Sequence, residues 1–345
     1  MSKKVAVALS GGVDSSVTAL LLKQQGFDVI GVTALTTDTE DARQVIANAD
    51  EVAKKLNIPF FPLDVTELFK EKVINYFENS YRNGETPNPC IMCNKYMKWG
   101  VLFDYATREL GADYIATGHY ANIKECNGVY KFYPASDEHK DQLYFLFQLN
   151  QEQLKKTLFP LSNYRKDEVR KIAFDNNLPS KSSKESQDIC FIKAPNTTKK
   201  YLNSLFRPRK GLFIENSTGK VLGEHDGFWQ YTIGQRKGIG LAAPEALYVV
   251  GIDAKSNTVF VGYKNELLTD KIILRDVNWS YPQTKKNFKA LVKIRYNMKA
   301  VSANVQIDET SAIITFDELV SKTAKGQACV LYDFEDGHLL GGAFI

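Results

Sequence analysis

The chain has 345 residues, of which 44% are hydrophobic and 24% charged, and its formal net charge is +4. This length exceeds one ordinary core and predicts two or three domains, and the composition is typical of soluble globular proteins. No apolar run approaches the roughly 20 residues that span a membrane. The first residues lead into a predicted strand, not a signal peptide, so we expect a cytoplasmic protein.

The first half of the chain alternates predicted strands and helices. Such alternation predicts an α/β domain with an open parallel sheet and helices on both faces. Ligands of such sheets bind at the carboxyl ends of the strands. The apolar patterns place strands at 4–9, 28–32, 60–65 and 114–117, and helices at 42–56, 66–81 and 103–110.

The run Ser10–Ser16 (SGGVDSS) joins the first strand to apolar residues at helical spacing. Glycines let a backbone approach a phosphate, and N–H groups at a helix N-terminus bind anions. No lysine follows the glycines, so the run is not the P-loop of P-loop NTPases. It resembles the pyrophosphate loop of ATP pyrophosphatases. Because Ser10 and Gly118 both follow predicted strands, we expect both segments at one sheet edge.

Five cysteines, an odd number, do not suggest a disulfide framework, and we expect thiols in a reducing compartment. Cys90 and Cys93 lie in a proline-restricted loop and fit half of a zinc site, a redox pair, or a nucleophile with a neighbour. The zinc alternative lacks a second pair, and the four histidines are scattered. Cys190, in the run SQDICF, would by itself be an ordinary buried residue.

Helical patterning fades after about residue 195, and short alternating strands with glycine and asparagine turns follow. We expect a catalytic domain at 1–195, a small β-rich linking domain at 196–270 and a C-terminal β-barrel at 271–345. Residues 271–299 hold eight basic residues and one acid. This stretch fits either a polyanion-binding surface or a solvated strand face.

Together these motifs resemble those of bacterial-type tRNA-specific 2-thiouridylases, the MnmA family within the ATP pyrophosphatases. The resemblance covers nearly the whole chain. It rests on the runs SGGVDSS, TPNPCIMCN, ATGHY, KDQ, SQDICF and YTIGQRKG. It implies an adenine nucleotide alpha hydrolase-like catalytic domain and sulfur transfer to the wobble uridine of tRNA.

The resemblance also assigns roles to matching residues. It implies that Cys93 is the nucleophile and that Cys190 carries a persulfide and forms a transient disulfide with Cys93. The implied ATP-binding residues are Ala8, Leu9, Ser10, Gly11, Gly12, Val13, Asp14, Ser15, Ala34 and Gly118. The residues implied to border the target base or contact tRNA are Asn88, Pro89, Cys90, His119, Lys140, Asp141, Gln142, Arg295, Tyr296 and Gln327.

The implied reaction transfers AMP to the C2 oxygen of uridine, after which sulfur from Cys190 displaces AMP. Sulfur transfer requires thiolates, so we expect lowered pKa values at Cys93 and Cys190. Mg²⁺ would accompany ATP with Asp14 as a partner, and no permanently bound cofactor is expected. A cysteine desulfurase or sulfur relay would donate sulfur, and tRNAs for Lys, Glu and Gln would accept it.

Some members of the family carry Asp where this chain has Cys90, and a thiol has a much higher reference pKa than a carboxylate. Cys90 therefore has another role, or the acid is not essential. Two other functions remain open. One is an amide-forming ATP pyrophosphatase, which would not explain the cysteines, and the other is a non-catalytic tRNA-binding module with a vestigial nucleotide site.

Overall fold

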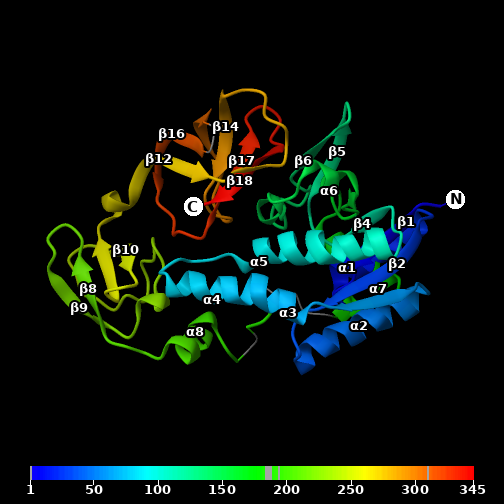
Figure 1. The fold of residues 1–345 in the computed structure, drawn as a ribbon, viewed down its shortest axis with the longest axis horizontal. Coiled ribbons are helices and arrows are strands. Elements are labelled where there is room, and N and C mark those ends of the chain that lie inside the picture. The colour runs from blue at the N-terminus through cyan, green and yellow to red at the C-terminus, as the bar shows by residue number, and fades with distance from the viewer. Residues whose placement is uncertain (1, 183–188, 193–194, 309–310) are drawn as a thin grey trace.

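The computed structural model describes residues 2–182, 189–192, 195–308 and 311–345. Its strands form three separate sheets and one hairpin (Figure 1). The N-terminal sheet, the middle sheet and the C-terminal sheet follow one another along the chain, as the sequence predicts. No helix in the described part of the chain is long and apolar enough to cross a membrane.

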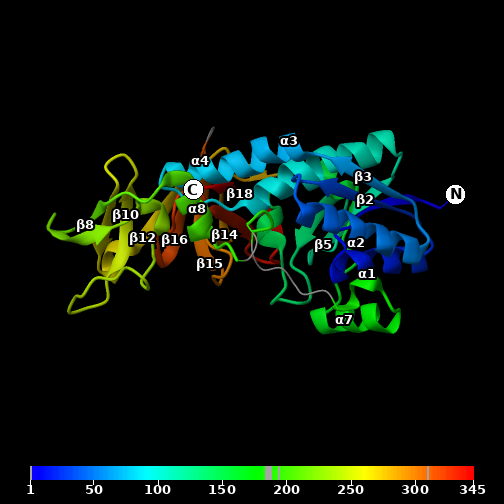
Figure 2. The same cartoon turned by 90° about the horizontal axis from the view of Figure 1, so that it is seen from below.

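The N-terminal sheet is parallel throughout and has the order β3-β2-β1-β4-β7. Val5 and Val7 of β1 face a core formed with the helices α1, α2 and α7, whereas Ala6 between them faces Leu102 and Ala106. Burial of both faces explains the continuous apolar sequence of β1. Figure 2 shows α1, α2 and α7 on one side of this sheet and the helical segments of residues 66–82 and 89–109 on the other. The elements are β1 (Lys4–Ala8), α1 (Val13–Gln24), β2 (Asp28–Leu35), α2 (Glu40–Leu56), β3 (Phe60–Asp64), β4 (Tyr114–Ala116), β7 (Thr157–Leu158) and α7 (Lys166–Asp175).

Two long, irregular helical segments lie between this sheet and the rest of the molecule. The first comprises α3 (Thr66–Phe69), η1 (Lys70–Ile74) and α4 (Asn75–Arg82), and the second α5 (Pro89–Met92), η2 (Cys93–Leu102) and η3 (Tyr105–Glu109). The segments η1, η2 and η3 are π-helical, a geometry often found at functional sites. Gly100 interrupts the second segment with φ −107° and ψ −109°.

Several elements follow β4 that the sequence analysis did not predict. The hairpin β5–β6 turns at Asn127 and Gly128, both with positive φ, as a two-residue hairpin turn requires. The elements are β5 (Asn122–Cys126), β6 (Val129–Tyr133), η4 (Leu143–Leu146), α6 (Gln151–Lys155), η5 (Pro179–Ser182) and α8 (Thr198–Phe206).

The middle sheet has the order β10-β11-β8-β9 and is antiparallel except between β11 and β8. Its core includes Phe213, Trp229, Val249 and Val261. The elements are β8 (Gly211–Glu215), β9 (Val221–His225), η6 (Phe228–Gln230), β10 (Tyr248–Asp253), β11 (Thr258–Gly262) and η7 (Lys264–Leu267).

The C-terminal sheet is antiparallel, with the order β12-β16-β15-β14-β17-β18-β13, and it curls so that β12 approaches β18. This curl corresponds to the barrel expected from the sequence. The boundary predicted near residue 270 falls inside β12. The strands are β12 (Leu268–Arg275), β13 (Asn278–Trp279), β14 (Asn287–Lys293), β15 (Val301–Ile307), β16 (Ser311–Ser321), β17 (Ala328–Asp333) and β18 (Leu339–Phe344).

The N-terminal and C-terminal parts share one hydrophobic core. Phe147 is fully buried and packs in one cluster with Ala328 and Leu339 of the C-terminal sheet. Its backbone oxygen accepts hydrogen bonds from Asn278 Nδ2 (2.7 Å) and Ser280 Oγ (2.9 Å). The two parts are therefore held together by apolar packing and by directional bonds at the same residue.

We expect Phe147→Ala to lower the free energy of unfolding by about 3–5 kcal/mol, because it leaves a cavity in this shared core. Phe174→Ala is the matched control, since Phe174 is 69% exposed. The control change should cost no more than about 0.5 kcal/mol. Denaturant titration measures both variants, and equal losses would contradict the shared core.

Candidate functional site

The loop Ser10–Ser16 is fixed by its own hydroxyl groups. Ser10 N donates to Ser15 Oγ at 3.1 Å, and Ser16 Oγ donates to the Gly12 oxygen at 2.7 Å. Gly11 has φ +69°, and a Cβ there would lie 2.5 Å from the Cβ of Asn48 in α2. Only glycine fits this turn, which leads the backbone into the N-terminus of α1 at Gly12. The resulting geometry is suited to an anion.

The second strand-end segment lies directly against this loop. Pairing of Val7 with Ala116 aligns the carboxyl ends of β1 and β4. A Cβ at Gly118 would lie 2.8 Å from both the carbonyl carbon of Asp14 and the nitrogen of Ser15. The expectation that both segments meet at one sheet edge is therefore confirmed. Ala34 lies near the carboxyl end of the adjacent strand β2, paired with Leu63.

Asp14 is held by a lysine that the sequence analysis did not identify. Lys166 Nζ lies 2.7 and 2.6 Å from the two carboxylate oxygens of Asp14, and Tyr120 Oη donates to Oδ1 at 3.1 Å. Lys166 is the first residue of α7, more than 150 positions from the loop in sequence, and no motif marks it. This lysine adds a positive charge beside the anion-binding turn.

Cys90 and Cys93 lie on consecutive turns at the start of the second helical segment. Asn88 Oδ1 accepts from Cys90 N at 3.2 Å and caps α5, and Pro89 occupies its first position, where the missing N–H is not needed. Cys90 is exposed and Cys93 half-buried. The side chains therefore project from a helix N-terminus whose local sequence explains its start.

The structure brings Cys190 close to these two thiols. Cys190 is exposed, and both Cys93 and Cys90 act electrostatically on its thiol. The next residue, Phe191, packs edge-on against Phe69 (6.0 Å between ring centroids) and Phe77 (5.3 Å) of the first helical segment. The composition of 179–187, rich in serine, lysine and glutamate, is typical of a mobile loop, but most of this segment and the first three residues of the run SQDICF lie outside the described residues. In the described part, Cys190 therefore lies within electrostatic range of both other thiols.

The expectation of lowered thiol pKa values is wrong for this conformation. Exclusion of water by the surrounding protein raises the pKa of Cys93, and it raises the pKa of Cys190 to about 12. The pKa of Cys90 is raised by the same cause. Lys98 opposes the rise at all three thiols. Desolvation exceeds the effect of one lysine, so the thiols are protonated near neutral pH.

Lys98 connects the cysteine helix to the edge of the sheet that carries Gly118. It lies on η2, five residues after Cys93, and its Nζ donates to His119 Nε2 at 3.1 Å. His119 is buried, and Nδ1 lies 2.8 Å from Thr117 Oγ1. Desolvation and then Lys98 hold the pKa of His119 well below its usual value, so the ring is neutral and Nε2 accepts. A polar chain thus runs from the thiols to the residue after Gly118.

Some of the residues implied to contact tRNA lie where the N-terminal and C-terminal parts meet. Tyr296 Oη donates to the Asp141 backbone oxygen at 2.9 Å, and Ala135 N donates to the Asp141 carboxylate at 3.1 Å. Burial raises the pKa of Asp141 to about 6. Gln142 Oε1 accepts from Tyr120 N. This bond attaches the neighbouring loop, including Lys140, to the segment that follows β4. The structure brings this group together, and contact with tRNA stays a prediction.

Thr86, just before the cysteine helix, is hydrogen-bonded to loops of both the middle and the C-terminal domains. Its N–H donates to the Lys325 oxygen (2.8 Å), its carbonyl accepts from Gln327 Nε2 (2.7 Å), and its hydroxyl donates to Thr232 Oγ1 (3.2 Å). We call these contacts the Thr86 junction. Through it, the segment that begins at Thr86 and carries the cysteines is positioned by the middle and C-terminal domains.

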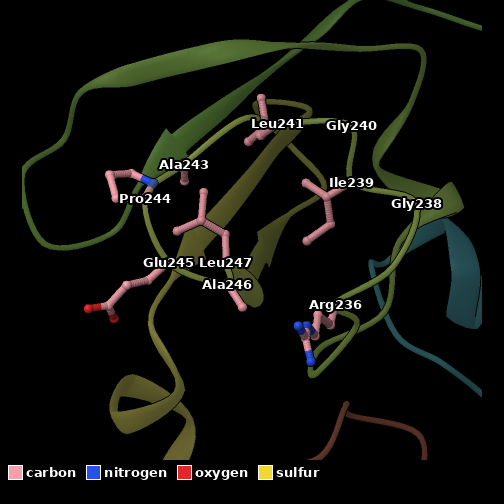
Figure 3. Close-up of a pocket in the computed structure, with 10 residues that line it drawn as sticks. All are labelled: Arg236, Gly238, Ile239, Gly240, Leu241, Ala243, Pro244, Glu245, Ala246 and Leu247. Carbon is pink, nitrogen blue, oxygen red and sulfur yellow. The ribbon is translucent and has the colours of Figure 1, made fainter.

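The motif YTIGQRKG forms a loop of the middle domain near this junction. A Cβ at Gly234 would lie 3.2 Å from the guanidinium of Arg295, whose Nε donates to Thr323 Oγ1 at 3.2 Å. The same loop continues around a cavity of about 320 Å³ (Figure 3). Arg236 extends from the rim of this cavity, whereas the lining is otherwise largely small and apolar. The cavity contains none of the predicted catalytic residues.

The zinc alternative gains no support from the geometry. In the described ranges, the group of three potential ligands with atoms within 4.8 Å of one another consists of Asp333, Asp336 and His338. This group is far in sequence from Cys90 and Cys93. Asp336 Oδ2 already accepts from Lys131 Nζ at 2.8 Å. The role of Cys93 as a nucleophile stays a prediction.

Lys98→Met should raise the thiol pKa of Cys93 further and slow its alkylation severalfold at pH 8, because the opposing charge is lost. Lys95→Met is the control on the same helix, where Nζ lies over the Tyr96 ring. Mass spectrometry of iodoacetamide-treated peptides over a pH series measures the rates. Equal rates in the two variants would show that Lys98 does not tune the thiol.

Comparisons with known proteins agree with this geometry. Family models match residues 3–194 (tRNA methyl transferase HUP domain), 199–263 (tRNA methyl transferase PRC-barrel domain) and 269–345 (Aminomethyltransferase beta-barrel domain). The tRNA-specific 2-thiouridylase MnmA of Clostridium acetobutylicum is 42% identical over 360 residues, which cover 100% of both chains. The protein of the same name from Clostridioides difficile is 41% identical, over 100% of this chain and 98% of its own.

A third relative, the tRNA-specific 2-thiouridylase MnmA of Nostoc punctiforme, is 40% identical over 349 residues and 99% of each chain. Such identity across the whole length includes all three domains, not the nucleotide-binding domain alone. The chain belongs to the MnmA family of tRNA-specific 2-thiouridylases.

Proposed function

We propose that this protein uses ATP to replace the C2 oxygen of the wobble uridine in tRNA with sulfur, releasing AMP and pyrophosphate. The observation that carries the proposal is the convergence of an ATP pyrophosphatase loop and three thiols, linked by Lys98 and His119. The C2 oxygen of uridine is a poor leaving group, and transfer of AMP to it creates a good one. The loop supplies this activation and the thiols supply sulfur.

The N-terminus of α1 and the loop before it would bind the phosphates of ATP. Backbone N–H groups of the loop bind the phosphates without reorganisation, and Lys166 is placed to compensate their charge. Asp14 offers the oxygen ligands that Mg²⁺ prefers, so the residue fits a magnesium–ATP complex. Bound Mg²⁺ would neutralise charge on the phosphates. Because Lys166 holds Asp14 here, ATP binding would redistribute this ion pair.

The sulfur side begins with a persulfide on Cys190, whose exposure permits loading by a donor protein such as a cysteine desulfurase or sulfur relay. The Cys93 thiolate attacks the inner sulfur, forms a Cys93–Cys190 disulfide and releases the terminal sulfur as hydrosulfide, which takes the electron pair. Hydrosulfide then attacks C2, and AMP leaves. Lys98 favours the Cys93 thiolate and attracts the anionic sulfur.

The tRNA would lie across the basic stretch 271–299 and reach Asn88, Pro89 and Cys90 with an unstacked wobble base. Anticodon bases are single-stranded and can be extruded into a pocket. Tyr296 and Gln327 lie where the C-terminal domain meets the N-terminal part, and Arg295 lies against Gly234 of the middle domain. These positions support a role in orienting the anticodon loop. The acceptors we propose are tRNAs for Lys, Glu and Gln.

The other candidate functions explain less of the site. An amide-forming ligase would need the loop but not the thiols, and a vestigial binding module would need neither. The family-model descriptions name methyl transfer. Methyl transfer from a sulfonium donor requires neither a pyrophosphate loop nor a thiol that carries sulfur, whereas thiolation uses both.

Thiolation is tested with unmodified tRNA, ATP, Mg²⁺ and a persulfide donor, with nucleosides analysed by mass spectrometry. We expect 2-thiouridine from the wild type and from Cys126→Ser, since Cys126 lies on the hairpin β5–β6. Cys190→Ser should give no detectable product with the persulfide donor, because a hydroxyl cannot carry the transferable sulfur. Product from Cys190→Ser at the wild-type rate would remove Cys190 from the mechanism.

Gly118→Ala should weaken ATP binding by about tenfold or more, equivalent to ~1.4 kcal/mol per tenfold, because its Cβ would push the turn away from Asp14 and Ser15. Gly251→Ala is the control, as its Cβ would make ordinary contacts of 3.4–3.8 Å with Phe260. Calorimetry with a non-hydrolysable ATP analogue gives the affinities. Unchanged affinity in Gly118→Ala would place the nucleotide elsewhere.

A further inference from the structure

Cys90 is the thiol to which the proposed reaction gives no chemical task. It precedes Cys93 by three residues, and the intervening Met92 and Cys93 itself have helical φ and ψ values. Side chains three apart on a helix are neighbours, with Cβ atoms roughly 5–6 Å apart. A disulfide spans Cα atoms separated by about 4.4–6.8 Å, so these two cysteines can be joined after a small adjustment.

Cys90 lies within electrostatic range of the other two thiols and is accessible from outside. Cys90 acts electrostatically on both Cys93 and Cys190, and Lys98 acts on all three. Cys90 is also exposed, whereas Cys93 is only half-exposed behind it. The other cysteines are elsewhere: Cys126 is on the hairpin, and Cys329 is fully buried in the C-terminal core. Cys90 is therefore the thiol best placed to react both with a Cys93–Cys190 disulfide and with an external reductant.

We propose that Cys90 is a resolving thiol that releases Cys190 after each sulfur transfer. This inference rests on the proposed function, which leaves a Cys93–Cys190 disulfide. The Cys90 thiolate attacks Sγ of Cys93, forming a Cys90–Cys93 bond and breaking the Cys93–Cys190 bond. Cys190 leaves as a thiolate with the electron pair, so this exchange involves no net oxidation.

A dithiol reductant then supplies two electrons and two protons to reduce the Cys90–Cys93 disulfide and becomes a disulfide itself. Separating the release of Cys190 from the reduction step has a physical advantage. Cys190 is available for the next persulfide before a reductant reaches the site. The pair on α5 and η2, of which Cys90 is exposed, is reduced separately.

The test follows one turnover without reductant. Enzyme treated with sodium polysulfide, to load Cys190, is desalted and mixed with unmodified tRNA, ATP and Mg²⁺. Thiols are then blocked with excess N-ethylmaleimide under denaturing, mildly acidic conditions, in which disulfide exchange is slow, and tryptic peptides are mapped without reduction. Cys90 and Cys93 share the peptide 83–95, and Cys190 lies in the peptide 185–193. The two disulfides therefore give different products.

In the wild type we expect the peptide 83–95 with an internal disulfide, lighter by two hydrogens than the reduced peptide, and an alkylated Cys190. In Cys90→Ser we expect 83–95 cross-linked to 185–193, and a severalfold lower multiple-turnover rate with limiting dithiol. Cys90→Ala checks that the result does not depend on the serine hydroxyl. Cys126→Ser is the control and should give the wild-type pattern.

A wild-type sample that retains the 83–95 to 185–193 cross-link with an alkylated Cys90 would overturn the resolving role, as would the absence of any disulfide after turnover. Nucleosides from the same samples are analysed for 2-thiouridine. If no 2-thiouridine forms, the proposed function itself fails. If it forms while Cys90 stays alkylated, only the resolving role fails.

Discussion

The pairing of β1 with β4 is the constraint on which the site depends. Val5 pairs with Tyr114 and Val7 with Ala116, so both strands end at the same edge. Gly118 then lies against the first turn of α1 so closely that no side chain fits between them. The next residue, His119, accepts from Lys98 on the cysteine helix. This strand register therefore sets how the glycine turn at 10–16 lies relative to Gly118 and His119.

The Thr86 junction adds a second constraint from the other two domains. Three hydrogen bonds reach one residue from Lys325, Gln327 and Thr232, and the cysteine helix begins three residues later at Pro89. These bonds hold the start of the cysteine helix to both the middle and the C-terminal domains, so the placement of Cys90 and Cys93 depends on all three parts of the chain.

The sequence predicted the parallel sheet and the shared edge of Ser10 and Gly118, because apolar runs and glycine turns are local signals. It did not reveal Lys98 or Lys166, whose importance comes from distant partners, His119 and Asp14. The pair Asn127 and Gly128 is typical of a hairpin turn, but no hairpin was predicted there. The thiol pKa direction was wrong because desolvation by packed helices has no signature in a cysteine motif.

The central claim is that ATP activates the oxygen that sulfur replaces, and an isotope experiment tests it most directly. Transfer RNA transcribed with uridine carrying ¹⁸O at C2 is thiolated by the enzyme with unlabelled ATP, and the released nucleotide is analysed by mass spectrometry. The account predicts one ¹⁸O in AMP for each 2-thiouridine formed. AMP without label, or ¹⁸O released as water or in pyrophosphate, would contradict it.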